Sequence, residues 1–289
     1  MKILLLYCKE HPLIGFGYFF LILLILLALS ADFIGLYPPE LSSPKDYLLP
    51  PSLKHFFGTD ETGMDIFSRC IYAIRLDLVI AILGTFVSAS LGTALGAFVG
   101  YYEGQGVFKN AFSTLIMRSL DVIQSFPVFV FAIALVAIFG QGLYSIIAAI
   151  AFVNLPIYVR LMRNQALSIR KMRYVEASYL SGLSDSKIIT FHIVPNSLGP
   201  VLSQLSVNIG WSVLLTAALS FAGAGIAAPT PEWGSMIAIG FQNVVTGQWW
   251  PSIFPGIFLG LTVFSFALIG ASIEVLADPV RRRAAIARY

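Results

Sequence analysis

Several stretches of the sequence are long and apolar enough to cross a membrane, and this feature restricts the fold more than any other. A spanning helix needs about 20 mostly apolar residues. The stretches are Leu13–Leu36, Leu78–Tyr101, Leu115–Phe139, Leu143–Leu161, Val201–Phe221 and Ile253–Leu276. Backbone groups in lipid must be paired within the structure, and the short alternating segments of a membrane β-barrel are not seen in the sequence. We therefore predict an all-α integral membrane protein with about six transmembrane helices.

The composition supports this class. Hydrophobic residues make up 57% of the 289 residues and charged residues 11%, which is too little polar surface to cover a soluble globule of this size. The first stretch follows Lys2 and Lys9 and ends in "LALSAD", a pattern that a secretory signal peptide also shows. Because the stretch is long for the apolar core of a signal peptide, we favour an uncleaved first span.

The Lys and Arg residues predict the orientation, because cytoplasmic flanks carry an excess of them. With the N-terminus inside, most of these residues fall on or near the cytoplasmic side, and so do both termini and the loop 165–198. The exceptions are Lys45, Lys54, Arg69 and Arg75. The basic residues are scattered over separate loops, which argues against a nucleic-acid-binding surface. Cys8 and Cys70 then lie on opposite sides of the membrane and cannot form a disulfide within the chain.

The sequence lacks the common signatures of enzyme chemistry. It contains no G-x-x-x-x-G-K-[ST] phosphate loop, so any ATP chemistry must come from a partner, and no G-x-S-x-G nucleophile. His11, His55 and His192 are dispersed, and we expect no metal site. The segment "GTDETGMD" does not have the spacing of a calcium loop, so we interpret it as an ordinary solvated turn.

Three features of the spans carry predictions of their own. Small residues recur every four positions in the second stretch, which predicts a smooth face where another helix packs closely. They are Ser88, Gly92, Gly96 and Gly100. Asp121 stands three residues after Arg118, a helical spacing that predicts an ion pair. Pro127 should kink the third span, and the sequence leaves open whether the kinked helix lines a path or packs against its neighbours.

The loop between the fourth and fifth spans is long for a helical bundle, which suggests a functional role. Good helix formers predict a first short helix over Arg173–Ser181, and Gly182 permits a break after it. Ser184 and Asp185 are typical caps of a second short helix.

We expect the second helix to run through Lys187 to Phe191 and Pro195 to stop it before the fifth span. The result is a small helical hairpin that projects from the membrane bundle. A rigid projection of this kind is suited to docking into a groove of another protein.

The hairpin sequence resembles a known motif. Glu176-Ala177-Ser178, then Gly182, then "HIVP" ending at Pro195 is similar to the E-A-A…G…I-x-L-P coupling motif of ABC importer permeases. The stretches "HFFGTDETGMDIFSR", "GAFVGYYEG", "FPVFVFAIALVAIFG" and "PTPEWGSMI" resemble the dipeptide/oligopeptide/nickel branch of that family, in its C-subunit type. The resemblance extends from about Phe57 to Pro279.

The resemblance implies a type I ABC importer permease fold. The transmembrane domain would be 77–277, after an N-terminal region 1–76 with the first span and a Pro-rich outer loop, and before a basic tail 278–289. A homologous permease, two cytoplasmic ATPases that bind ATP and Mg, and an extracytoplasmic substrate-binding protein would be its partners besides membrane lipid. The chain itself would bind no cofactor and would lie in a bacterial or archaeal cytoplasmic membrane.

The same resemblance implies site residues. Those expected to couple the permease to an ATPase are Glu176, Ala177, Ser178, Gly182, Ser184, Asp185, Ser186, His192 and Pro195. Those expected at the outer face, as contacts to a binding protein, are Asp60, Asp65, Glu232 and Trp233. Ser178 replaces the usual second alanine of the motif but keeps its small size.

The favoured function is therefore an ATP-driven importer of di- or oligopeptides, with nickel chelates and opine-like compounds as alternative ligands. An ion-coupled secondary transporter should show inverted repeats and interrupted helices, and a membrane enzyme should show a polar catalytic cluster. The sequence shows neither pattern. The outer loop 37–56 should be irregular, and an interaction role and a plain linker both stay open.

Overall fold

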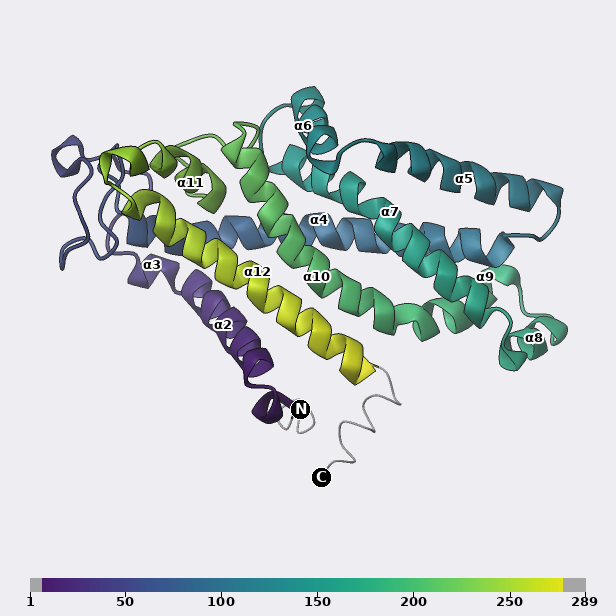
Figure 1. The fold of residues 1–289 in the computed structure, drawn as a ribbon. Coiled ribbons are helices and arrows are strands. Elements are labelled where there is room, and N and C mark those ends of the chain that lie inside the picture. Colours follow the sequence, from purple (N-terminus) through teal and green to yellow (C-terminus); the bar gives the residue numbers. More distant parts are fainter. Residues whose placement is uncertain (1–6, 278–289) are drawn as a thin grey trace. The chain divides into compact units, whose positions relative to one another are not determined.

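The computed structural model describes residues 7–277, and in this range helices and loops make up the fold apart from one isolated bridge between Thr59 and Asp65 (Figure 1). The predicted all-α class is confirmed. Within residues 7–277, 5 helical runs are long and apolar enough to cross a membrane. They are α2 (Pro12–Leu29), α4 (Ile66–Tyr102), α7 (Leu143–Ile169), the run Asp185–Phe221 that ends in α10 (Val194–Phe221), and α12 (Trp250–Ala277). The tail expected at 278–289 lies outside the described residues.

The third predicted span is broken. Its halves are α5 (Val107–Ser125) and α6 (Val128–Phe139), which bend by 96° at the break. Pro127 disfavours helical geometry in the residue before it, and Phe126 accordingly has an extended backbone with ψ 141°. The expectation of a single kinked helix is therefore wrong. If α5 and α6 together cross the membrane as one bent span, the described residues contain up to 6 spans.

The chain forms two compact units, which we describe separately. Unit 1 contains the described residues up to Gly84 together with Ala132–Ile150 and Ile209–Ile269. Unit 2 contains Thr85–Phe131, Ala151–Asn208 and the described residues from Gly270. The division cuts through long helices, so α4, α7, α10 and α12 each contribute to both units.

In unit 1, α2 lies along α12 (Figure 1). A Cβ added at Gly17 would lie 3.1 Å from the Cβ of Leu268, so the glycine permits a close approach of the two helices. Arg75 of α4 donates to the carbonyl of Ala28 (2.6 Å) and to the carboxylate of Asp32 in α3 (Ala31–Ile34). The first span is thus held by packing and by a charged anchor at its end.

The segment between α3 and α4 is irregular, as predicted, apart from η1 (Pro44–Asp46) and the isolated bridge. It is nevertheless packed onto the helices of unit 1. Trp250 donates its indole N–H to the carbonyl of Thr59 (3.1 Å), and Arg69 donates to the carbonyl oxygens of Pro39 (2.7 Å) and Pro229 (2.9 Å). The segment therefore covers one end of the unit and is not a free linker.

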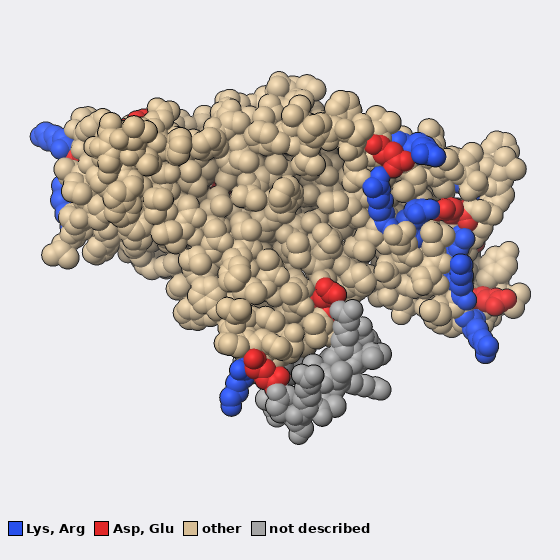
Figure 2. Space-filling view, in the orientation of Figure 1, with Lys and Arg blue, Asp and Glu red and all other residues tan. Residues whose placement is uncertain are grey.

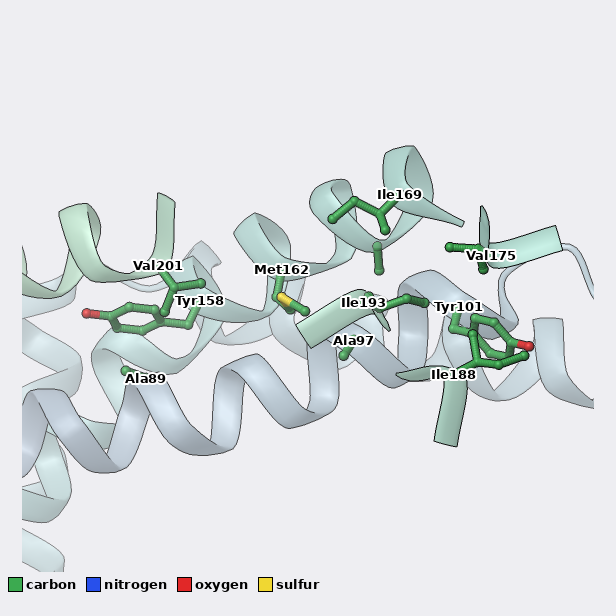
Figure 3. Packing of buried hydrophobic residues seen from close by; sticks show 11 residues of the cluster. Ala89, Ala97, Tyr101, Tyr158, Met162, Ile169, Val175, Ile188, Ile193 and Val201 are labelled. Atoms are coloured by element: carbon green, nitrogen blue, oxygen red, sulfur yellow. The ribbon is translucent and has the colours of Figure 1, made fainter. Parts of the chain in front are cut away.

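In unit 2, the small-residue face of α4 lies against α7. A Cβ added at Gly92 would lie 2.4 Å from the Cβ of Tyr158, and at Gly96 or Gly100 it would lie 2.5 Å from a backbone oxygen of α7. Ser88 on the same face is fully buried. These positions bring the two backbones together, and Figure 3 shows the buried side chains that fill the remaining space.

Ion pairs join α7 to α5 in the same unit. Arg160 donates to the Asp121 carboxylate at 2.6 Å, and Arg118 approaches the other oxygen of that carboxylate at 3.5 Å. The predicted pairing of Arg118 with Asp121 is confirmed, but Arg160 is the nearer partner. Both cysteines are free, which agrees with the prediction that Cys8 and Cys70 do not pair.

Candidate functional site

The predicted hairpin is present in unit 2. Its helices are α8 (Arg173–Leu180) and α9 (Asp185–Ile188), and we refer to residues 173–188 as the α8–α9 hairpin. Gly182 has φ +82° and donates its N–H to the carbonyl of Tyr179 (3.0 Å), while Leu183 donates to that of Ser178 (3.2 Å). This pair of bonds is the Schellman closure that favours glycine. A Cβ at Gly182 would meet no heavy atom within 4 Å, so the glycine is required by the backbone angle and not by close packing inside the chain.

The second half of the hairpin differs from the prediction. α9 continues through a π-helical turn, η2 (Ile189–Ile193), directly into α10, so Pro195 does not stop the helix. Pro195 is the second residue of α10 and directly follows the wider π turn, so the helical run continues through it. Ser184 occupies the N-cap position of α9 but makes no side-chain capping bond, so the expected side-chain capping is wrong.

The carboxylate of Asp185 is used elsewhere. One oxygen accepts a hydrogen bond from the hydroxyl of Tyr101 at the end of α4 (2.9 Å), and the other faces the ammonium group of Lys109 at the start of α5 (3.3 Å). Val175 and Ile188 of the hairpin belong to the same buried cluster as Tyr101, and Figure 3 shows Ile188 beside the Tyr101 ring. The hairpin is thus attached to α4 and α5 by polar and apolar contacts together.

The end of α4 is also fixed to α7. Arg170 donates to the carbonyl oxygens of Gly100 (3.1 Å), Tyr101 (2.9 Å) and Glu103 (2.6 Å). These oxygens lie at the negative end of the α4 dipole, where a cation contributes about 0.3–1 kcal/mol. Arg163 holds the Glu103 carboxylate with two bonds of 2.6 Å. Hydrogen-bonded charges therefore surround the turn between α4 and α5.

Part of the hairpin surface is exposed. Glu176 and Ala177 are exposed on α8, and among the described residues no side chain forms a hydrogen bond or ion pair with the Glu176 carboxylate. Leu180 is 78% exposed and Phe191 66% exposed. Exposed apolar side chains beside exposed polar ones are typical of a surface that contacts another protein.

The remaining residues of the motif divide between the two faces. Ser184 and Ser186 are exposed, whereas Ser178 and His192 are half-buried and lie 3.3 Å apart, from Oγ to Nε2. Asn196 in α10 donates to the carbonyl of His192 (2.6 Å). Ser178 and His192 therefore join α8 to the π turn that follows the hairpin.

A cleft of about 650 Å³ lies beside α8. Its lining includes Glu103, Gln105, Arg170, Lys171, Glu176 and Tyr179. Charges of both signs line it, and Figure 2 shows acidic and basic side chains gathered at the end of unit 2 that carries the hairpin. Its mixed polarity suits the side chains of another protein better than an apolar ligand.

Two of the outer-face candidates organise the start of α4 in unit 1. Asp60 accepts from the backbone N–H groups of Thr62 (2.8 Å) and Met64 (3.0 Å). Asp65 caps α4 by accepting from the N–H of Ser68 (2.8 Å) and bonds the ring of His55 (2.8 Å). Asp60 is half-buried, but Asp65 is only 3% exposed, so the interpretation of this segment as a solvated turn is wrong.

The other two outer-face candidates are fully buried. Glu232 is the N-cap of α11 (Trp233–Phe241), and its carboxylate accepts from the N–H groups of Gly234 (2.8 Å) and Ser235 (2.7 Å). Trp233 donates its indole N–H to the carbonyl of Cys70 (3.1 Å). Both have 0% exposure, so their side chains, like that of Asp65, are packed inside unit 1 and not on its surface.

Three residues at the hairpin were not identified from the sequence. Tyr101, Lys109 and Arg170 appeared only as the end of an apolar stretch and as positive flanks. Their hydrogen-bond partners lie 67 to 84 residues away in the chain, so no local sequence pattern indicates these contacts. No group of three or more His, Cys, Asp or Glu side chains within 7–277 is placed to hold a metal ion.

These features define a class of protein. The chain resembles a solved structure of the inward-facing MetNI methionine ABC transporter with a TM-score of 0.59 at 18% identity, over 73% of this chain and 96% of that one. The likeness identifies the fold as that of a type I ABC importer permease. Residues 92–283 match the family described as binding-protein-dependent transport system inner membrane component, and the chain belongs to this family.

Curated relatives align over almost the full chain. The dipeptide transport system permease protein DppC of Alkalihalophilus pseudofirmus is 36% identical, over 94% of this chain and 87% of that protein. The glutathione transport system permease protein GsiD of Pectobacterium atrosepticum is 35% identical, over 94% and 88%. The resemblance inferred from the motifs is therefore confirmed, and the chain is an inner membrane component of a transport system.

Proposed function

We propose that this chain is the permease subunit of an ATP-driven importer and forms, with a homologous permease, the path for di- or oligopeptides. The observation that carries the proposal is the α8–α9 hairpin, with its turn at Gly182 and its exposed Glu176 and Ala177. The hairpin belongs to a chain of this transport family. The substrates named for two relatives, dipeptides and the tripeptide glutathione, support a peptide substrate.

The proposed partners supply the ATP hydrolysis and the substrate delivery. Two cytoplasmic ATPases bind ATP and Mg, and an extracytoplasmic binding protein delivers the substrate. The chain itself binds no cofactor and catalyses no reaction. Both termini and the hairpin lie on the cytoplasmic side, a topology supported by the bias of Lys and Arg toward that side.

In this proposal the hairpin transmits movement. ATP binding brings the two ATPases together and carries each docked hairpin with them. α8 follows α7 in the chain, and α9 runs without a break into α10, so a displaced hairpin tilts both helices. The permease then changes from inward-open to outward-open, which is a rigid-body transition between two states.

Uptake into proteoliposomes tests the proposal. The purified complex, with the binding protein that co-purifies with it, should accumulate a radiolabelled dipeptide only when ATP is supplied on the ATPase side. Ionophores should leave the uptake unchanged, and excess unlabelled dipeptide should compete while a nickel chelate does not. Accumulation that follows an ion gradient without ATP would favour a secondary transporter instead.

A further inference from the structure

Asp185 is oriented differently from the exposed residues of the hairpin. It is the first residue of α9, and its side chain is 30% exposed. Its carboxylate bonds Tyr101 on α4 and Lys109 on α5, as described above. Glu176, in contrast, is exposed on α8. The two acidic residues of the hairpin therefore have different roles.

The chain connects the hairpin directly to only two helices. α7 precedes α8, and α10 follows α9 through the π turn. The helices α4 and α5 are joined to each other by a short turn, and neither is next to the hairpin in the chain. A force from the hairpin reaches them either through α7, to which Arg170 and Arg160 attach them, or through the hairpin's own side-chain contacts.

We propose that Asp185 is a positioning residue that fastens the α8–α9 hairpin to α4 and α5 through Tyr101 and Lys109. A hairpin moved by an ATPase then acts directly on the turn between α4 and α5, in addition to the attachment of these two helices to α7. This inference rests on the proposed function, because it concerns how the same hairpin acts within the importer.

The contacts are suited to this role. Two donors from two helices approach the two oxygens of one carboxylate, so the bonds fix both position and orientation. The ammonium group of Lys109 also lies 4.1 Å from the centroid of the Tyr102 ring, which holds it at the same place by a cation–π contact. The apolar contacts of Val175 and Ile188 do not depend on the carboxylate, so its removal should loosen the attachment without unfolding the hairpin.

The test uses the whole transporter in proteoliposomes and compares ATP hydrolysis with and without the binding protein. We expect Asp185→Ala to lower the stimulation, given as the ratio of hydrolysis with the binding protein to hydrolysis without it, about tenfold. Lys109→Ala, an exposed change on another helix, should lower it in the same direction, and Lys109→Arg should retain it. Thr114→Ala is the control, because Thr114 is exposed on α5 and its hydroxyl donates to the carbonyl of Asn110 within that helix.

Two further measurements separate fastening from a general loss of structure. The Asp185→Ala/Lys109→Ala double variant should lower the stimulation no further than the more impaired single variant does. The effects of two substitutions that remove the same interaction are not additive. Spin labels at 111 and 187, with Cys8 and Cys70 replaced by Ser, should give one narrow distance distribution that is kept when ATP and vanadate trap the complex. Asp185→Ala should broaden it.

Normal stimulation in an assembled Asp185→Ala complex, additive effects in the double variant, or an unbroadened distance would each overturn the inference. If the unmodified transporter itself shows no stimulation by the binding protein, the proposed function fails. If it is stimulated and the variants match it, only the role of Asp185 fails.

Discussion

A Gly182→Val variant should insert into the membrane at a normal level and lose peptide uptake by about tenfold or more. Gly182 has φ +82°, where a β-branched side chain costs roughly 1–2 kcal/mol or more. The turn would leave this conformation and release the two hydrogen bonds that close α8. The hairpin would then present its exposed face at a different angle, so ATP hydrolysis would no longer be converted into uptake. The measurement is uptake per assembled complex in proteoliposomes.

Two controls isolate the hairpin in this experiment. Gly182→Asn should keep most of the uptake, because asparagine tolerates the left-handed conformation. Gly247→Val introduces similar strain at φ +93°, also with no heavy atom within 4 Å, but outside the hairpin in unit 1, and it should transport nearly normally. Undiminished uptake by Gly182→Val, or an equal loss in both valine variants, would contradict the coupling role.

A Gly96→Leu variant should fail to accumulate as a folded chain. A Cβ at this position would lie 2.5 Å from the carbonyl oxygen of Val159 and 2.8 Å from the Cβ of Met162, and neither a backbone atom nor a first side-chain carbon can rotate away. Overpacking of this kind costs roughly 1–3 kcal/mol and often more. We expect a clear fall in the melting temperature of the detergent-solubilised chain and in its yield.

The matched control for the packing prediction is Gly260→Ala in α12. A Cβ there meets no heavy atom within 4 Å, and alanine favours a helix over glycine by roughly 1 kcal/mol. Its melting temperature should be equal to or above that of the unmodified chain. A Gly96→Leu chain that melts at the same temperature as Gly260→Ala would show that α4 and α7 are not closely packed.

Hydropathy predicted the membrane spans because their length and apolarity are local properties of the sequence. The break at Pro127 was underestimated for a physical reason. Proline shows that a helix is disturbed at that point, but the 96° bend depends on the surroundings into which α5 and α6 each fold. The continuation of α9 into α10 was missed because a π turn has no clear sequence signal.

In the candidate site too, features set by the local sequence were predictable and contacts between distant residues were not. The turn at Gly182 was predictable because helix ends use local signals such as glycine. Asp185 was interpreted as a helix cap, yet its partners are 84 and 76 residues away in the chain. Glu232 was expected at the outer face because of the family resemblance, but the neighbouring N–H of Trp233 donates to buried Asp77 (3.1 Å) and the segment lies inside unit 1.

The most direct test of the central claim is to purify the detergent-solubilised chain from its native membrane and identify the proteins that accompany it. An importer permease coupled through the α8–α9 hairpin should bring with it a second permease and cytoplasmic ATPases, together with a binding protein that takes peptides. Recovery of this chain alone, as a homo-oligomer that transports with an ion gradient, would contradict the account.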